Sequence, residues 1–496
     1  MDTGSWNGRY SLAIALIMAV GACTGEGAAD RSASSAVEAD LLGGASTALG
    51  QVASTGDSPA QSAATAPTAT PITQCPTDGA RTGQSGIPES LRGLQTTAES
   101  ITVGDFTVDF AAHPLPYPEG NPWSHWGKGR LASNGKFYTA VGDHGSGGSC
   151  GRIDSDGNSL LYEYDPTTRV LRAVGDALSA AGEHRPGENG YGKIHSQIDE
   201  GPCGMLYLHT YWGSSRCVTY TDTYRGDLLL RYDPRTEDLQ SVGVVMPGHG
   251  TPSTNMWEAG GLLYGEANVS EDGKDTKFWV WDTETQTLKY RETAGVDRRN
   301  RNIAVDLRGR AYINDGRNGL RRYDPETNEI EQLDLRFDHG GTDEFLRAST
   351  ERVEDGTLTL VTENNTDASG NRQRRYSEFY HFDPEHGSLT WLAHDDRYVG
   401  DIEADPTGRV AYYTPGAHES ANDFSVVELN RTTGEKRVLV SLGEAIRDAG
   451  GPHPGGSFSV SISPDGRTLF FASNSTLERP GLPMIVVVHI PPSEMP

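Results

Sequence analysis

Histidine and tyrosine residues stand at the ends of short apolar segments, where their side chains could perform acid and base chemistry. His125 precedes the segment RLASNGKFYTAV and His144 follows it, whereas His195 precedes and Tyr211 follows IDEGPCGMLYLHT. A neutral imidazole can accept a proton, and a tyrosine hydroxyl can donate one. We therefore treat these four residues as candidate catalytic groups, although a single histidine beside a strand is more often structural.

Further cationic and polar residues occupy the equivalent places in later segments. The chain has a formal net charge of -26, which argues against nucleic acid as a partner because phosphate contacts need a basic face. A local basic cluster in such an acidic protein would instead attract an anionic ligand. The candidates for binding it are Arg298, Arg299, Arg301, Asn364 and His418, with His453 as a candidate metal ligand. The arginine run could equally be a solvated loop.

These residues are positioned by a repeated pair of hairpins. One half of the repeat ends in an aromatic and an acidic turn, as in LLYEYDPTTRVL, LLLRYDPRTEDL and GLRRYDPETNEI. In Asp-Pro-x-Thr the proline fixes φ and the Asp side chain caps the turn, so we expect a hairpin. The other half is a hairpin with a glycine-containing turn, as in RLASNGKFYTAV and IAVDLRGRAYIND. Two hairpins make one four-stranded antiparallel blade.

Seven copies of the pattern predict an all-β, seven-bladed β-propeller over residues 100–496. The first halves begin near residues 129, 198, 256, 303, 349, 401 and 459. The segment ITVGDFTVDF (101–110) could supply the missing outer strand of the last blade and so join the two ends of the chain. A solenoid is the alternative, but it would need capping repeats, which neither end resembles.

Propeller geometry predicts which side chains meet. The innermost strand of each blade starts at one mouth of the central channel, and the second strand returns to that mouth. Residues just before the first strand and just after the second are therefore expected to gather there. His209 alternates to the opposite side of its strand from Thr210, so we interpret it as packing between blades.

The N-terminal region predicts export. Arg9, an apolar run and Val20-Gly21-Ala22-Cys23 indicate a signal peptide over 1–23 whose end resembles a bacterial lipobox. Cys23 is then the site of lipidation, and an ordinary secretory peptide is the alternative. Residues 24–99 predict a low-complexity, disordered tether, since the stretch up to about residue 74 has few large apolar side chains. The expected location is the cell envelope, lipid-anchored at the outer membrane or surface, or secreted.

Four further cysteines fit an oxidising location. Cys150 and Cys217 both follow second strands, so they share a mouth, and we predict a disulfide between them. Three connectivities are possible for the four cysteines, and we predict Cys75 with Cys203 as the second pair.

The stretch GKIHSQIDEGPCGMLYLHTYWG, with His125 and His144 upstream, resembles seven-bladed polysaccharide lyases of the ulvan-lyase type. The resemblance implies β-elimination on a uronic-acid polymer, with His195 as base, Tyr211 as acid, and His144 or an arginine neutralising the carboxylate. His453, followed by SFSVSISPDGR, resembles a segment of oligogalacturonate lyases in which a histidine helps to hold a divalent metal. The dense metal cluster of that family is absent here, because Ser457 and Ser459 occupy the nearby strand. The cofactor therefore stays unknown, with a divalent metal as one option.

Two other kinds of function fit the same fold, because a propeller does not specify an activity. A non-catalytic, monomeric surface propeller would bind a glycan, a small molecule or a protein at the channel mouth and would touch the membrane only through its lipid anchor. A glycoside hydrolase would use paired carboxylates. The candidates for those carboxylates, all expected near the channel mouth, are Glu258, Glu266, Asp315 and Glu363, and no motif singles out two of them.

Overall fold

The computed structural model describes twelve stretches of the chain. The described residues are 86–116, 124–142, 158–182, 191–211, 225–269, 273–299, 301–339, 344–351, 353–366, 372–417, 423–475 and 482–496. The chain divides into the units Met1–Ala64 and Thr65–Pro496, and every described residue belongs to the second. The fold below is that of this second unit.

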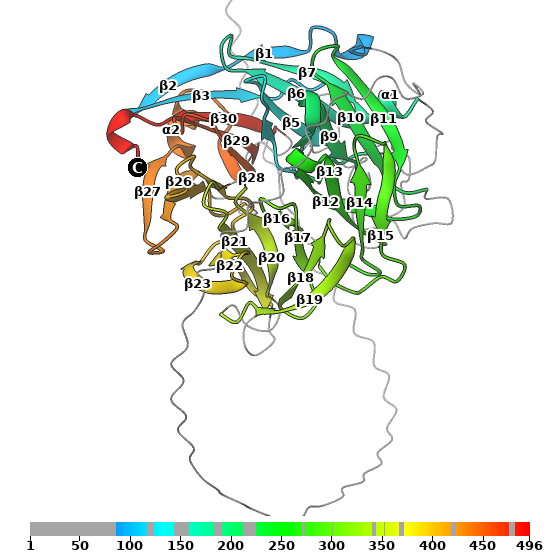
Figure 1. Cartoon of the computed structure of the whole chain (residues 1–496). Helices are drawn as coiled ribbons and strands as arrows, with labels where there is room; N and C mark the ends of the chain where they lie inside the picture. The colour runs from blue at the N-terminus through cyan, green and yellow to red at the C-terminus, as the bar shows by residue number, and fades with distance from the viewer. Residues whose placement is uncertain are drawn as a thin grey trace, which may run out of the picture. The chain divides into compact units, whose positions relative to one another are not determined.

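Seven antiparallel sheets form the blades of a propeller (Figure 1), which confirms the predicted fold class. Each sheet is given from its innermost strand outward. Blades 1 to 3 are β4 (Arg130–Leu131), β5 (Phe137–Gly142), β6 (Ser159–Asp165), β7 (Val170–Asp176) and β1 (Gln95–Thr97); β8 (Asp199–Glu200), β9 (Leu206–His209), β10 (Leu228–Asp233) and β11 (Asp238–Val244); β12 (Gly250–Trp257), β13 (Leu262–Asn268), β14 (Lys277–Asp282) and β15 (Thr287–Arg291).

The remaining blades follow the same order. Blades 4 to 7 are β16 (Ala304–Val305), β17 (Ala311–Asn314), β18 (Gly319–Asp324) and β19 (Glu329–Arg336); β20 (Glu344–Ser349), β21 (Leu358–Thr366), β22 (Arg372–Asp383) and β23 (Ser388–Asp395); β24 (Glu403–Ala404), β25 (Val410–Tyr413), β26 (Ser425–Asn430) and β27 (Lys436–Ser441); β28 (Pro454–Ile462), β29 (Thr468–Ser475), β30 (Met484–His489), β3 (Phe106–Ala112) and β2 (Glu99–Val103).

The helices in the described stretches are short. They are α1 (Ala177–Ala181), α2 (Gly443–Asp448) and the 3-10 turns η1 (Glu89–Leu91), η2 (Pro202–Gly204), η3 (Glu258–Gly260) and η4 (Pro492–Glu494). None of the helices in the described stretches has the length and apolar character needed to cross a membrane.

The predicted acidic turns form as expected. Asp165 Oδ1 accepts a hydrogen bond from the backbone N–H of Thr167 at 2.8 Å, and Asp233 and Asp324 make the same contact two residues ahead. The residue four positions after the Asp that caps the turn, which is Asn430 in blade 6, adopts positive φ in each outer hairpin of blades 1 to 6. These residues are Arg169 (56°), Glu237 (56°), Gln286 (55°), Asn328 (59°), Gly387 (61°) and Gly434 (75°). Four of the six hairpins therefore place a side chain in a left-handed conformation that costs it backbone energy.

The two ends of the chain close the ring in blade 7. Val108 of β3 pairs with Val488 of β30, and Phe110 pairs with Val486. The prediction that this segment joins the two ends of the chain in the last blade is thus confirmed, but residues 101–110 are not a single strand: the chain turns at Gly104 and Asp105, so that β3 supplies the outer strand and β2 adds a fifth strand beyond it. Buried apolar side chains pack between neighbouring blades; Phe137 of blade 1, for example, stacks on Phe470 of blade 7 with ring centroids 5.4 Å apart.

Strands β1 and β2 are joined by the single residue Ala98 but belong to different blades. β1 pairs with β7 at the outer edge of blade 1, whereas β2 pairs with β3 in blade 7. This segment, residues 95–103, is called the strap below, because it crosses the junction at which the ring closes. Ordered structure therefore begins before residue 100, the predicted start of the propeller, and the boundary was placed too late because the strap is too short and polar to read as a strand.

Candidate functional site

Residues in or just before the innermost strands of all seven blades line one pocket, called the channel pocket below. The sequence-predicted residues His195 and Arg301 belong to it. Its lining residues are Trp126, Lys128, His195, Gln197, Pro252, Ser253, Thr254, Arg301, Asn302, Arg347, Gly400, Asp401 and Phe458. The convergence of segments that start innermost strands is the arrangement predicted from propeller geometry.

His195 is held in one tautomer. Its Nδ1 lies 2.9 Å from the carbonyl oxygen of Pro252, so Nδ1 carries the proton and donates it to that oxygen. Nε2 is then the basic nitrogen. The imidazole meets the ring of Tyr211 edge-on at 5.2 Å and stacks parallel to Trp126 at 6.2 Å. The rings of His195 and Tyr211 are therefore neighbours as predicted, but Tyr211 is buried and, unlike His195, does not itself line the channel pocket.

The imidazole is uncharged in the folded protein. Burial lowers the pKa of His195 well below its ordinary value, and the positive charges of Arg301, Lys193 and Arg347 lower it further. A cationic imidazole would be repelled by all three neighbours. His195 is therefore a proton acceptor at neutral pH.

The cations around His195 lie against aromatic rings. Lys193 Nζ is 5.5 Å from the ring centre of Trp126 and 5.8 Å from that of Tyr211. The Arg347 guanidinium lies 5.4 Å from Tyr398 and 5.6 Å from Phe458, and its Nε donates a hydrogen bond to the Tyr398 hydroxyl. These contacts hold the positive charges in fixed places within a chain of net charge -26.

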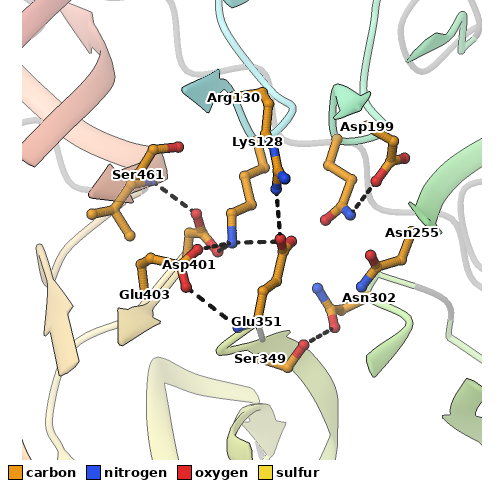
Figure 2. Close-up of polar contacts among 12 residues, drawn as sticks. Lys128, Arg130, Asp199, Asn255, Asn302, Ser349, Glu351, Asp401, Glu403 and Ser461 are labelled. Carbon is orange, nitrogen blue, oxygen red and sulfur yellow. Dashed lines mark hydrogen bonds and ion pairs between the residues drawn. The ribbon is translucent and has the colours of Figure 1, made fainter. Parts of the chain in front are cut away.

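A network of buried ions lies next to the pocket in the channel (Figure 2). Lys128 Nζ is 3.0 Å from Glu403 Oε2, 3.4 Å from Glu351 Oε1 and 3.5 Å from Asp401 Oδ1, and Arg130 donates to Glu351 at 2.9 Å. Asp401 Oδ2 also accepts from the backbone N–H of Val460 at 2.8 Å. Burial raises the pKa of Asp401 to about 7 despite Lys128, and it also raises that of Glu403. Lys128 thereby connects blades 1, 5 and 6.

Asp199 is a second buried acid beside the pocket. Its Oδ1 accepts from Gln197 Nε2 at 2.6 Å, and its Oδ2 accepts from Thr254 Oγ1 at 2.8 Å. Burial raises the pKa of Asp199 to about 7 because these neutral donors only partly replace hydration. The carboxyl therefore changes its charge near neutral pH.

The prediction that His125 joins His195 is wrong. Trp126 and Lys128 line the channel pocket, whereas His125 does not. The backbone N–H of His125 donates to Asn474 Oδ1 at 2.7 Å, which fixes this segment against blade 7. Burial, and then the nearby His113, lower the pKa of His125 to about 3. The ring is part of the interior between blades 7 and 1.

The predicted arginine cluster separates into three environments. Arg298 is fully buried, with Nε 2.8 Å from Glu266 and Nη2 3.0 Å from Glu292, so the assignment of Arg298 to substrate binding is corrected to an interior ion pair. Arg299 lies over the ring of Phe345 at 5.1 Å. Arg301 alone of the three lines the pocket.

Asn364 and His453 also lie away from the channel pocket. Asn364 is buried near the end of β21, where it pairs with Glu344 across the sheet. His453 Nδ1 contacts the carbonyl oxygen of Pro454 at 3.0 Å, and Nε2 lies 3.9 Å from Glu444 of α2. Within the described residues no group of three or more His, Cys, Asp or Glu side chains could hold a metal ion, so nothing supports His453 as a ligand.

Several predicted residues lie outside the described residues. His144, His418, Cys23, Cys75, Cys150 and Cys217 all fall there, and of the five cysteines Cys203 alone is described. Both predicted disulfides and the lipidation site stay predictions. His209 packs between blades as expected, with its ring 5.8 Å from that of Trp279 in blade 3.

The carboxylates considered for glycoside hydrolysis do not form a pair facing the pocket. Glu266 is paired with Arg298, and Asp315 Oδ2 lies 2.5 Å from Arg336 Nη1. Glu258 lies in η3, at the turn between β12 and β13 and so at the end of blade 3 opposite to the channel mouth. Glu363 is buried 3.9 Å from Arg347 Nε. The placement of Glu258 near that mouth was therefore wrong.

Sequence reasoning missed Trp126, Lys128, Lys193, Arg347 and Asp401. Trp126 and Lys193 stand one and two residues from predicted histidines, so the same positional rule would have found them. Arg347 lies in the innermost strand of blade 5, and Asp401 lies just before that of blade 6. The residues predicted for these two blades, Asn364 and His418, were instead taken from the end of the second strand or just after it.

Comparison with known proteins assigns neither a family nor an activity. No family model matches the chain, and no curated protein matches it. Solved structures similar to it include an oligogalacturonate lyase in complex with manganese, at 15% identity over 80% of this chain and 98% of the other, with a TM-score of 0.45. An oligogalacturonate lyase from Vibrio parahaemolyticus matches at 14% identity, 81% and 99% coverage and TM-score 0.47.

The RRP9 WD40 repeats match as well, at 9% identity, 79% and 100% coverage and TM-score 0.48. The oligogalacturonate lyases are of the kind that the sequence resemblance named. At these identities and TM-scores the matches carry no argument about chemistry, and the unrelated WD40 repeats match equally well. The function must be argued from the channel pocket.

Proposed function

We propose that this protein binds a uronic-acid polysaccharide at the channel pocket and cleaves it by β-elimination. The proposal rests on the side chains that surround His195. A neutral imidazole with a fixed basic nitrogen lies beside Tyr211 and among Lys193, Arg301 and Arg347. A carboxylated sugar supplies the negative charge that these cations would pair with, and its ring can stack on the aromatic side chains.

Elimination uses these groups without further reactants. His195 Nε2 removes the proton from the carbon that carries the carboxylate, and the electron pair left behind forms a double bond to the neighbouring carbon. The bond from that carbon to the glycosidic oxygen breaks, and the Tyr211 hydroxyl donates its proton to the departing oxygen. Arg301 and Arg347 stabilise the charge that grows on the carboxylate. Solvent then returns a proton from His195 to Tyr211.

The ligand itself makes the base stronger. In the unliganded pocket the three cations disfavour protonation of His195. A bound carboxylate offsets their charge, so the pKa of His195 rises when substrate is present. Proton removal is thus favoured only on an anionic ligand, which gives the site a preference for uronic acids over neutral sugars.

The test is incubation of the purified protein with polygalacturonate, alginate and ulvan, with ultraviolet absorbance reporting the unsaturated product. We expect the product with at least one polymer, and a loss of at least a hundredfold in rate for His195→Ala. His209→Gln is the control, because that histidine is buried in the same blade but packs on Trp279. Hydrolysis without the unsaturated product, or binding without cleavage, would replace elimination by one of the two other functions.

We further infer that the protein acts in the cell envelope, attached through Cys23 or secreted. The N-terminal signal supports this location, and a secreted lyase would meet its polymer outside the cell.

A further inference from the structure

Ser253 is exceptional among the polar side chains that line the channel pocket. It lies on β12, the innermost strand of blade 3, and only 3% of its surface is exposed. Its hydroxyl has no hydrogen-bond partner among the residues that the structure describes. Burial of a hydroxyl without a partner costs free energy, so the position calls for an explanation.

The neighbouring polar groups are already engaged with one another. Thr254 Oγ1 donates to Asp199, and Gln197 Nε2 donates to the same carboxylate. Asn302 Oδ1 accepts from Ser349 Oγ at 2.9 Å. Ser253 therefore keeps both its donor and its acceptor capacity for a molecule that enters the pocket.

The position of Ser253 is tied to that of the base. Pro252, the preceding residue, fixes His195 through its carbonyl oxygen at 2.9 Å, and both residues line the pocket. Ser253 is bonded directly to Pro252, whose carbonyl holds the imidazole, and the pairing of β12 with β13 is irregular between Gly250 and Ser253. A hydroxyl held in this way would contact a sugar ring whose reacting carbon lies at His195 Nε2.

We propose that Ser253 determines which uronic acid the protein accepts, by hydrogen bonding to a ring hydroxyl of the bound sugar. This inference rests on the proposed function. Galacturonate, glucuronate and mannuronate share the orientation of the carboxylate and differ in the orientation of ring hydroxyls, so the cations cannot distinguish these three; guluronate differs from mannuronate at the carboxylate-bearing carbon and serves as a comparison. One fixed hydroxyl group in the pocket can distinguish the sugars. A ring hydroxyl in one orientation forms a hydrogen bond with Ser253, whereas a ring hydroxyl in the other orientation leaves Ser253 unpaired.

The test compares Ser253→Ala with Thr251→Val. Thr251 lies on the same strand, is fully buried and also has an unpartnered hydroxyl, but it does not line the pocket. Values of kcat/KM, and dissociation constants from calorimetry, are measured for oligomers of galacturonate, mannuronate, guluronate and glucuronate. We expect wild type to prefer one of them, and Ser253→Ala to reduce that preference about fivefold to tenfold, as for one neutral hydrogen bond. Thr251→Val should keep the preference.

Melting temperatures check that both variants fold. A second variant at the same position is Ser253→Cys, whose side chain has nearly the same shape but forms weaker hydrogen bonds. An intermediate preference for Ser253→Cys supports the inference. If wild type discriminates among the oligomers and Ser253→Ala discriminates equally well, the inference is wrong while the proposed function stands. If wild type binds none of the oligomers, the proposed function fails and the inference fails with it.

Discussion

Replacement of Asp199 by asparagine should make the propeller more stable at alkaline pH and leave it little changed at acidic pH. The carboxyl of Asp199 has its pKa raised from an ordinary 3.8 to about 7 by burial. A raised pKa means that the folded protein holds the proton more tightly than the unfolded chain does. The stability from this group is therefore fully present below about pH 4 and is lost as the pH rises towards 7.

The size of the effect on the free energy of unfolding follows from the rise in the pKa of Asp199. Each unit of pKa is worth about 1.4 kcal/mol, so ionisation of Asp199 costs the folded state up to about 4 kcal/mol above pH 7. The variant avoids that cost. It also weakens two charge-assisted hydrogen bonds, from Gln197 and Thr254, although the Gln197 amide can rotate to present its oxygen. We expect a net gain of roughly 1 to 2 kcal/mol in the free energy of unfolding at pH 8.

Urea unfolding of wild type and Asp199→Asn at pH 5 and pH 8 tests the prediction, because the difference in the free energy of unfolding between the two proteins should be larger at pH 8. Asp105→Asn, in the exposed turn between β2 and β3, is the control and should show no such growth. Parallel curves for wild type and Asp199→Asn would mean that the carboxyl of Asp199 is already ionised at pH 5 in the folded protein, as it is in the unfolded chain, and the argument from desolvation would be refuted.

Two further outcomes are expected. Lys128→Met leaves Asp401 and Glu403 without a directly paired cation and Glu351 with Arg130 alone, so it should lower the free energy of urea unfolding at pH 8 by about 3 to 5 kcal/mol, with a smaller loss at pH 5. The more exposed pair made by Lys136 should cost about 1 kcal/mol or less in Lys136→Met, and equal losses would contradict the reasoning. In a Cys203→Ser background, in which neither truncation removes a disulfide through Cys75, removal of residues 1–98 takes away β1 and the buried Leu91 and should destabilise the protein by about 2 to 3 kcal/mol. Removal of 1–85 in the same background should leave the melting temperature unchanged, and a stable 99–496 protein would show that β1 is dispensable.

The fold could be predicted because its signal is repeated. The acid at the end of the third strand recurs with the same turn chemistry, and the seven glycine turns have comparable spacing, so an error in one copy is corrected by the others. Ring closure by 101–110 was also predictable, since the last blade lacked an outer strand. Strand β1 of the strap was not predicted, because its three residues carry too little apolar pattern to indicate a strand.

The site could be predicted only in part. His195 and Tyr211 meet because their places in the blade are fixed by strand order, which the sequence shows. His125 obeys the same rule but faces the neighbouring blade, and the sequence does not show which way a residue in an irregular segment turns. The pairing of Arg298 with Glu266 was hidden for another reason. The two residues lie 32 positions apart, and charge alone does not show that an arginine is buried.

The pairing of β3 with β30 also sets the order of folding. Val108 of β3 pairs with Val488 of β30, so β3 has no partner on its inner edge until the end of the chain has been synthesised. Blades 2 to 6 can form as synthesis proceeds, but the first-made hairpin keeps an unsatisfied edge until the end. We expect closure to be slow, since a contact of such long sequence separation carries a large entropic cost. A chain stopped even a few residues short of Met484 would leave that edge open to association with other chains.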